Sequence, residues 1–199
     1  DVGKYSLVVG ATNYDVCISC EAGRFKEISE NRGILCRLCD NGKYSKRGAD
    51  YCISCPTGKF NKGNLDSDHI DCTSCPSGRF SNLLGADNLN KCNNCPPGRF
   101  SNIEGLNNSL GCIPCMIGKY NDVIGSNSES DCITCPRGKI RQFLGGTSIN
   151  DCIDCPSGYY SNDGEDRCRE CLPGMYNDNN GNLGCFNCIV GKNYCIKCF

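Results

Sequence analysis

The amino-acid sequence predicts a small disulfide-rich fold. Tandem repeats of about 20 residues, built from short β-strands and turns with almost no helix, are expected to stack into an elongated rod. All 22 cysteines lie in C-x-x-C pairs. A motif, C-x-x-C-P-x-G-[KR]-aromatic, recurs with small variations every 20 residues from Cys52 to Cys152. Apolar residues other than cysteine are sparse and Trp is absent, so each repeat must be held by covalent bonds rather than by a large core.

We interpret residues 1–199 as a single repeat array without a linker or a second domain. Looser copies of the motif flank the regular ones. The repeats start near Cys17, Cys36, Cys52, Cys72, Cys92, Cys112, Cys132, Cys152, Cys168 and Cys185. Partial repeats stand at both ends, where residues 1–6 match the second half of the motif and residues 195–199 form a C-x-x-C followed by one residue. These two partial repeats predict either a segment of a longer array or a unit that joins end to end.

Each repeat is expected to open with a tight turn, as in the copy that starts at Cys52. Pro56 presets its own φ, and Gly58 accepts a positive φ without a steric penalty. The aromatic residue that follows, Phe60, is expected to start a short extended segment and to cover the neighbouring disulfide. The remainder is rich in Asn, Asp, Ser and Gly around one apolar spot, such as residues 83–85. There we predict a short strand, a turn at the glycine and a return strand.

Charge, hydropathy and cysteine content restrict the partners and the compartment. The 21 Lys and Arg residues are interspersed with 22 Asp and Glu residues, which leaves no electrostatic case for nucleic acid or an anionic membrane. The longest apolar run, residues 7–9, is far too short for membrane insertion. Cysteine usage at this level is typical of oxidising compartments, so we predict a location outside the cell or at its surface.

These motifs resemble a known family. The pattern C-x-x-C-P-x-G-x-[FY]-S is similar to the ephrin-receptor-like cysteine-rich repeats over nearly the whole chain, and more distantly to the first submodule of tumour-necrosis-factor-receptor domains. The regular spacing is also similar to ciliate surface antigens, and the Asn-, Lys- and Ile-rich composition favours a protist surface or fibre protein. The family occurs in receptor ectodomains, adhesion and matrix proteins, so the resemblance implies an extracellular, non-catalytic role.

The resemblance also implies a disulfide pairing, in which the second cysteine of each motif bonds the first cysteine of the next. The implied pairs are Cys20–Cys36, Cys39–Cys52, Cys55–Cys72, Cys75–Cys92, Cys95–Cys112, Cys115–Cys132, Cys135–Cys152, Cys155–Cys168, Cys171–Cys185 and Cys188–Cys195. In the chain-entropy account most of these loops stabilise the fold by about 3 kcal/mol each. Cys17 and Cys198 are left over. We expect them either to bond each other between copies, head to tail, or to find partners in a longer chain.

Three other chemistries have weaker support. Two C-x-x-C pairs about 16 residues apart match the spacing of a zinc ribbon, but the constant 20-residue step lacks the alternation of long and short gaps that paired zinc knuckles would need. Redox catalysis needs a C-x-x-C at a helix N-terminus, and no such helix is predicted. His69 is the only histidine, in an Asp-rich loop, and is interpreted as a solvated surface residue. No catalytic or metal-ligating residue is assigned.

Two surface features remain as expectations. Residues 162–166 and 177–182 are rich in Asn, Asp and Gly and could supply oxygen ligands to calcium, although neither carries a full calcium-loop signature and both read equally as Asx turns. No cofactor is otherwise predicted. Asn107 opens a glycosylation sequon with Asn108 and Ser109 in a predicted surface loop, so an attached glycan is expected there.

The sequence as a whole predicts an extracellular structural protein of a surface coat, appendage or secreted fibre that polymerises with itself. The alternative is a stalk or ligand-binding ectodomain of a receptor or surface antigen. A binding module should show repeat-specific exposed aromatic or charged departures from the motif, whereas the repeats from Cys52 to Cys152 are near-uniform. A zinc-binding repeat protein is the third interpretation.

Overall fold

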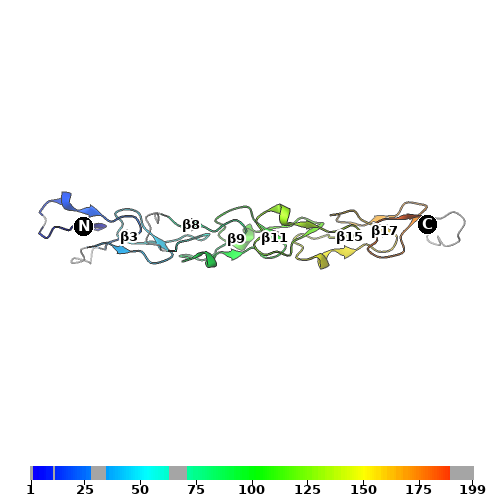
Figure 1. Cartoon of the computed structure of the whole chain (residues 1–199), viewed down its shortest axis with the longest axis horizontal. Helices are drawn as coiled ribbons and strands as arrows, with labels where there is room; N and C mark the ends of the chain where they lie inside the picture. The colour runs from blue at the N-terminus through cyan, green and yellow to red at the C-terminus, as the bar shows by residue number, and fades with distance from the viewer. Residues whose placement is uncertain (1, 11, 28–34, 63–70, 189–199) are drawn as a thin grey trace. The chain divides into compact units, whose positions relative to one another are not determined.

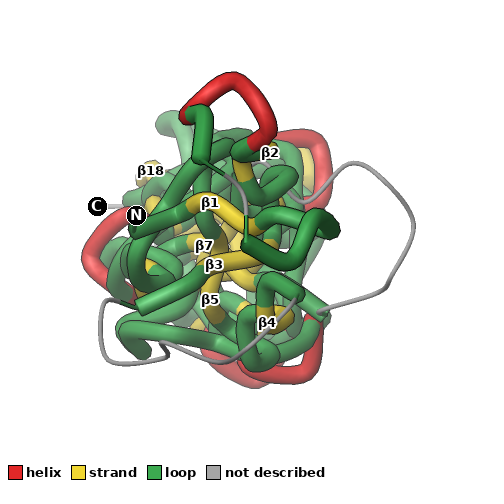
Figure 2. The backbone as a smooth tube through the Cα atoms, turned by 90° about the vertical axis from the view of Figure 1, so that its left-hand side faces the viewer, coloured by secondary structure: helices red, strands yellow, loops and turns green. Residues whose placement is uncertain are grey.

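The computed structural model describes residues 2–10, 12–27, 35–62 and 71–188 (Figure 1). Loops and turns make up most of this part of the chain, as the green tube in Figure 2 shows, and its helical segments are short 3-10 turns. The chain divides into two compact units whose segments alternate in the sequence. Unit 1 comprises Asp1–Asn93 and Ile103–Gly111, and unit 2 comprises Asn94–Asn102 and Cys112–Phe199.

The described residues contain twenty two-residue strands in ten two-stranded sheets. The strands are β1 (Lys4–Tyr5), β2 (Ile18–Ser19), β3 (Arg24–Phe25), β4 (Arg37–Leu38), β5 (Lys43–Tyr44), β6 (Ile53–Ser54), β7 (Lys59–Phe60), β8 (Thr73–Ser74), β9 (Arg79–Phe80), β10 (Asn93–Asn94), β11 (Arg99–Phe100), β12 (Ile113–Pro114), β13 (Lys119–Tyr120), β14 (Ile133–Thr134), β15 (Lys139–Ile140), β16 (Ile153–Asp154), β17 (Tyr159–Tyr160), β18 (Arg169–Glu170), β19 (Met175–Tyr176) and β20 (Phe186–Asn187). The 3-10 helices are η1 (Tyr14–Val16), η2 (Leu89–Lys91), η3 (Ser109–Gly111), η4 (Glu129–Asp131) and η5 (Ile149–Asp151).

Each sheet joins the dipeptide after a motif glycine to the dipeptide between the cysteines of the next motif. In the β7–β8 sheet the strands are antiparallel, with Lys59 opposite Ser74 and Phe60 opposite Thr73. The same register recurs in unit 2, where Lys119 lies opposite Thr134 in the β13–β14 sheet. This arrangement confirms the predicted class: a small disulfide-rich tandem-repeat fold of short strands and turns with almost no helix.

The loop that leads to the next motif differs from the predicted return strand. Gly85 turns the chain with φ of 71°, and Ala86 forms a single parallel bridge to Phe60. The chain then enters η2, where the side chain of Asn88 accepts a hydrogen bond from the backbone N–H of Asn90. A side chain that satisfies the backbone locally competes with strand pairing, so a capped helical turn replaces the expected strand.

The core consists of small clusters that each combine one aromatic residue with one disulfide. In unit 1, Phe60 packs with Cys75 and Cys92. In unit 2, Phe100 packs with Cys115 and Cys132, and Tyr120 packs with Cys135 and Cys152 (three-residue clusters of buried side chains). The motif aromatic therefore covers a disulfide, as predicted, and the disulfide in question belongs to the next loop along the chain.

Candidate functional site

The recurring contact between successive motifs, here called the junction, is the candidate functional site. Its covalent element is the disulfide between one motif and the next. The structure joins Cys20–Cys36, Cys39–Cys52, Cys55–Cys72, Cys75–Cys92, Cys95–Cys112, Cys115–Cys132, Cys135–Cys152, Cys155–Cys168 and Cys171–Cys185. These are the pairs that the family resemblance implies. Cys188 is also disulfide-bonded, but Cys195, its predicted partner, lies outside the described residues.

Backbone hydrogen bonds join the motif turn to the following repeat. At the junction around Gly58, the N–H of Gly58 donates to the carbonyl of Ser81 over 2.7 Å, and the N–H of Cys75 donates to the carbonyl of Gly58 over 2.8 Å. The N–H of Gly85 donates to the carbonyl of Cys55 over 2.8 Å. The polar groups of the turn are thus paired between repeats, which couples each repeat to its neighbour.

The motif glycine also brings two backbones into direct contact. Gly58 has φ of 83°, and a Cβ atom on it would lie only 2.1 Å from the carbonyl oxygen of Gly105. Gly105 belongs to the second repeat beyond Gly58, so the contacts of a repeat reach beyond its nearest neighbour. The same approach joins Gly42 to Gly85, Gly98 to Gly145, Gly118 to Gly164 and Gly138 to Gly181. Only glycine has both the conformation and the room for this contact.

A buried polar side chain completes the junction, and the sequence analysis did not identify it. It stands three residues after the motif glycine. Ser45 donates to the carbonyl of Arg24 over 2.9 Å, and Asn177 donates to the carbonyl of Tyr159 over 2.8 Å. Both side chains are buried. The available signal was the restriction of this position to Ser or Asn in eight of the ten copies from Ser6 to Asn177.

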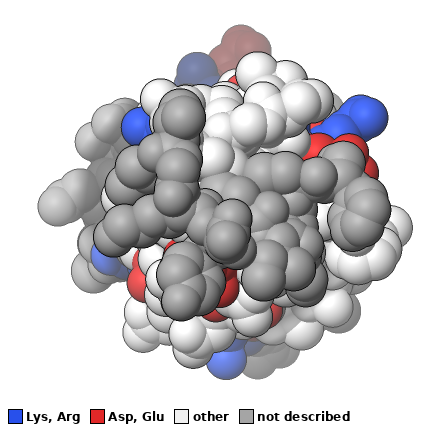
Figure 3. Space-filling view, turned by 90° about the vertical axis from the view of Figure 1, so that its right-hand side faces the viewer, with Lys and Arg blue, Asp and Glu red and all other residues white. Residues whose placement is uncertain are grey.

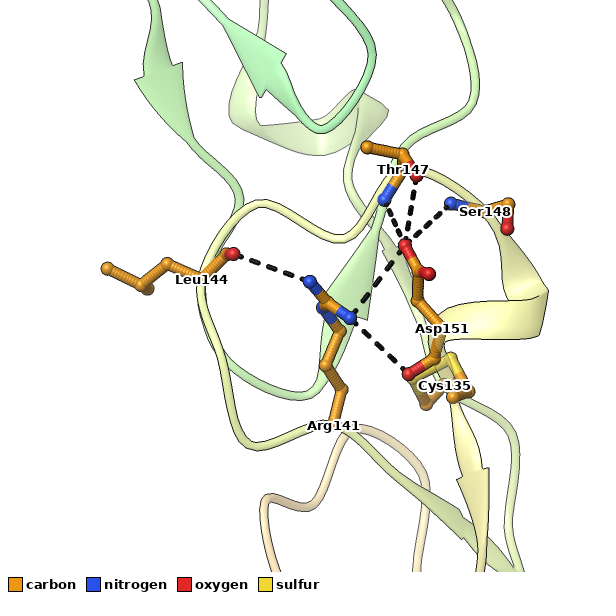
Figure 4. A network of polar contacts seen from close by, with 7 residues as sticks. Cys135, Arg141, Leu144, Thr147, Ser148 and Asp151 are labelled. Atoms are coloured by element: carbon orange, nitrogen blue, oxygen red, sulfur yellow. Dashed lines mark hydrogen bonds and ion pairs between the residues drawn. A yellow bond between two sulfur atoms is a disulfide. The ribbon is translucent and has the colours of Figure 1, made fainter.

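Arg141 occupies this position in one repeat of unit 2 and forms a different network (Figure 4). Its guanidinium donates to the carbonyls of Asp151 and Leu144, both over 3.4 Å, and lies 3.7 Å from the Asp151 carboxylate. That carboxylate accepts hydrogen bonds from the backbone N–H and hydroxyl of Thr147, which lower the pKa of Asp151. The network closes the loop that leads into η5.

The basic residue after the motif glycine makes polar contacts within the chain in several repeats. Arg99 donates to the carbonyl of Cys112 over 2.8 Å, and Lys119 lies 3.7 Å from the Glu129 carboxylate. On the face shown in Figure 3, blue and red atoms form small separate groups. Paired charges of this kind offer no single-sign surface to a polyanion.

The two predicted calcium loops use their oxygen atoms within the chain. Glu165 accepts hydrogen bonds from Asn162 and lies in an ion pair with Arg169, and Asp163 accepts from the N–H of Arg137. In the second loop, the side chain of Asn177 accepts from the N–H of Asn179. Within the described residues, no group of three His, Cys, Asp or Glu side chains is arranged to hold a metal ion. Calcium binding stays an expectation from composition.

The other residues singled out from the sequence are the two cysteines left over from the implied pairing, the histidine and the sequon asparagine. Cys17 is a free, half-buried thiol, whereas Cys198 and His69 lie outside the described residues. Asn107 is exposed in the loop before η3, where its side-chain oxygen accepts a hydrogen bond from Asn108 over 2.7 Å. The structure thus places the sequon asparagine at the surface.

The disulfides also bear on the zinc and redox interpretations. The two cysteines of one C-x-x-C bond in opposite directions along the chain: Cys52 pairs with Cys39, and Cys55 pairs with Cys72. A redox motif would require a bond within the C-x-x-C, and zinc would require thiolates at sulfur atoms that here form disulfides. Within the described residues no helix has the length and apolar character needed to span a membrane.

Together the fold and the junction define a class of protein, the disulfide-braced tandem-repeat proteins. A family model described as tyrosine-protein kinase ephrin type A/B receptor-like matches residues 42–92, 83–132 and 106–152, which together exceed half of the chain. The chain therefore belongs to the family of ephrin-receptor-like cysteine-rich repeats, and the resemblance inferred from the motifs is confirmed. A comparison with curated proteins finds no match.

The family and the series of disulfides between successive motifs both indicate the class of the protein and its compartment. Cysteine-rich, receptor-like repeats are structural or ligand-binding modules, and disulfides in this number form in oxidising compartments. The chain is accordingly an extracellular or secreted repeat protein.

Proposed function

We propose that this protein acts mechanically, as a structural component of a surface coat, an appendage or a secreted fibre. The observation that supports the proposal is the recurrence of one junction, with its disulfide, backbone hydrogen bonds and glycine contact, along both units of the chain. A ligand-binding site needs one repeat whose residues differ from those of the others. A structural element instead needs every repeat to bear the same mechanical load.

The disulfide pattern limits how far the chain can extend under tension. Between Cys20 and Cys185 the shortest covalent path crosses nine disulfides, each with a Cα–Cα distance of 5.7 or 5.8 Å, joined by the short C-x-x-C segments. That path measures about 140 Å when fully stretched, compared with about 580 Å for the same segment after reduction. About three quarters of the contour length of this segment therefore lies inside disulfide-closed loops, where an applied force cannot extend it.

Single-molecule stretching tests this mechanical role directly. The full chain would be held near its two ends and extended first oxidised and then in the presence of a reductant. The oxidised chain is expected to resist with little gain in length, and the reduced chain to lengthen by about 440 Å between Cys20 and Cys185. An oxidised chain that releases long segments at low force would contradict the mechanical proposal.

The family favours one alternative, a receptor stalk or ligand-binding ectodomain, because its description is of receptor-like repeats. Immunogold labelling of the native source separates the two functions. A structural protein should label continuous arrays or fibres outside the cell. Dispersed labelling, together with recovery of a stoichiometric ligand on mild extraction, would favour the receptor ectodomain.

We further propose that copies join head to tail through a disulfide between Cys17 and Cys198. Cys17 is the free thiol among the described cysteines. The segment before it already forms a junction, since β1 pairs with β2 and the N–H of Cys20 donates to the carbonyl of Gly3. Non-reducing electrophoresis of native material should show a ladder of oligomers that collapses on reduction. The same mass with and without reductant would exclude this bond.

A further inference from the structure

Four exposed apolar residues lie on two backbone segments that meet at one junction of unit 2. Met116, Ile117, Phe143 and Leu144 expose 55%, 38%, 72% and 53% of their surface. The N–H of Gly145 donates to the carbonyl of Cys115 over 2.8 Å, so the backbone of residues 143–145 runs beside that of residues 115–117. We call these four residues the Met116–Phe143 patch.

Corresponding positions in other repeats show how the Leu144 side chain is placed. Asp163 stands before a motif-loop glycine as Leu144 does, and its side chain accepts a hydrogen bond from the N–H of Arg137 over 2.8 Å. Asn180 accepts from the N–H of Ser157 in the same way over 3.0 Å. Leu144 holds the equivalent place beside Ile117, but its side chain cannot accept a hydrogen bond. Leu84 and Ile124 occupy the same place in two other repeats, beside Thr57 and Pro97, so Leu144 differs from them in lying beside the apolar Ile117.

The patch also departs from the motif on its other side. Most of the regular copies carry Pro after the second cysteine, whereas this repeat has Met116 followed by Ile117. Phe143 is the one aromatic residue at its position among the loops of the regular repeats. Met116, Ile117 and Phe143 are thus exposed, repeat-specific departures from the motif, which is the property expected of a binding surface.

We propose that the Met116–Phe143 patch is the contact through which two copies of this chain pack side by side, patch against patch. The inference rests on the proposed structural function. The four side chains carry no charge, so the patch is complementary to itself. The flexible Met116 thioether is suited to pack against the Phe143 ring of the second copy.

The size of the patch favours a second copy over a foreign partner. Its exposed apolar area is on the order of 400 Å², within the range of the largest patch on a typical soluble monomer. A stable interface between two separate proteins buries about 800 Å² on each partner. A contact of half that size is weak in dilute solution and becomes effective between copies that a coat or fibre already holds at high local concentration.

The test compares Leu144→Asp with Leu84→Asp in the full chain after free thiols are alkylated. Each change places a carboxylate where Asp163 and Asn180 cap the backbone, so both variants should fold. Sedimentation equilibrium from micromolar to millimolar concentration should show weak self-association of the wild type and of Leu84→Asp. Leu144→Asp should raise the dissociation constant at least about tenfold, because a carboxylate would be buried against an apolar surface.

A mixture of Leu144→Asp and Leu144→Lys chains tests the patch-to-patch geometry. If the two patches meet, the mixture should associate more tightly than either variant alone. A wild type that stays monomeric at all concentrations overturns the proposal, and so does an equal effect of Leu84→Asp. Coats or fibres that form normally from Leu144→Asp chains would overturn this contact alone, whereas native material without any array would overturn the structural function.

Discussion

The Arg141 side chain lies against the Cα atom of Gly146. A Cβ atom on Gly146 would stand 2.6 Å from Arg141 Nε. One repeat earlier the equivalent residues are Asn121 and Ser126, and their side chains share a hydrogen bond of 2.8 Å. The Arg141 side chain therefore fills space that a Cβ atom at position 146 would need, and the carbonyl oxygen of Lys119, 2.7 Å from that Cβ position, restricts it further.

This pairing predicts a specific coupling. Gly146→Ser alone should destabilise its repeat by about 1–3 kcal/mol, since the added atoms overlap the arginine and approach the Lys119 carbonyl. The double variant Arg141→Asn with Gly146→Ser recreates the Asn121–Ser126 pair and should recover the part of the loss that is due to the arginine. Urea unfolding with the disulfides intact, combined as a double-mutant cycle, measures the interaction energy. Additive effects of the two substitutions would show that the residues are independent.

The glycine contact between alternate repeats predicts a contrast between two motif glycines with the same backbone conformation. Gly58 and Gly158 have φ of 83° and 84°. A methyl group on Gly58 would collide with the carbonyl of Gly105, whereas one on Gly158 would meet no described atom within 4 Å. Gly158→Ala should cost about 1–2 kcal/mol through backbone strain. Gly58→Ala should cost at least about 2 kcal/mol more, because a backbone must move.

Amide hydrogen exchange at the two sites measures these local effects. The N–H of Gly58 is bonded to Ser81 and that of Gly158 to Asn177, so the exchange rate of each residue reports the opening of its own junction. Equal losses of protection in the two alanine variants would mean that the Gly58–Gly105 approach is not a constraint.

The sequence predicted the parts of the fold that the covalent pattern controls. Cysteine spacing and the turn chemistry of Pro56 and Gly58 led to the repeat, the short strands and the aromatic cover over each disulfide. It did not reveal that Gly58 meets Gly105, because a backbone contact between two glycines leaves no side-chain signature. The role of Ser45 and Asn177 was missed, because small polar residues resemble ordinary loop composition.

Removal of one disulfide should act locally. Replacing Cys75 and Cys92 together by alanine opens a loop with a sequence separation of 17 and should lower local stability by about 3 kcal/mol. The cluster around Phe60 loses its sulfur partners as well. Because repeat proteins transmit stability mainly between neighbours, exchange protection should fall near residues 72–92 and persist near residues 155–187. A uniform loss of protection over both regions would indicate one cooperative unit.

Glycosylation of Asn107 is the expected covalent modification. The side chain is exposed in the loop before η3, and its amide oxygen accepts the hydrogen bond from Asn108. Protein from a eukaryotic secretory host should lose the mass of one N-linked glycan on treatment with an amide-cleaving glycosidase. The Asn107→Gln variant should carry no such glycan, while Asn127→Gln, at the equivalent place in the next repeat but outside a sequon, serves as the matched control. An unmodified wild type from that host would refute the expectation.

Asp151 should make the η5 loop sensitive to acid. The backbone N–H and hydroxyl of Thr147 are the main cause of its lowered pKa, and Arg141 adds to the effect. A carboxylate whose pKa is lower in the folded than in the unfolded chain stabilises the fold above the unfolded pKa, and this contribution disappears as the pH falls through the folded value. The carboxyl carbon of Asp151 should therefore titrate below the ordinary value of 3.8 by nuclear magnetic resonance. Thr147→Val removes the hydroxyl and should move the midpoint upward, whereas an unchanged midpoint would show that this hydrogen bond does not hold the charge.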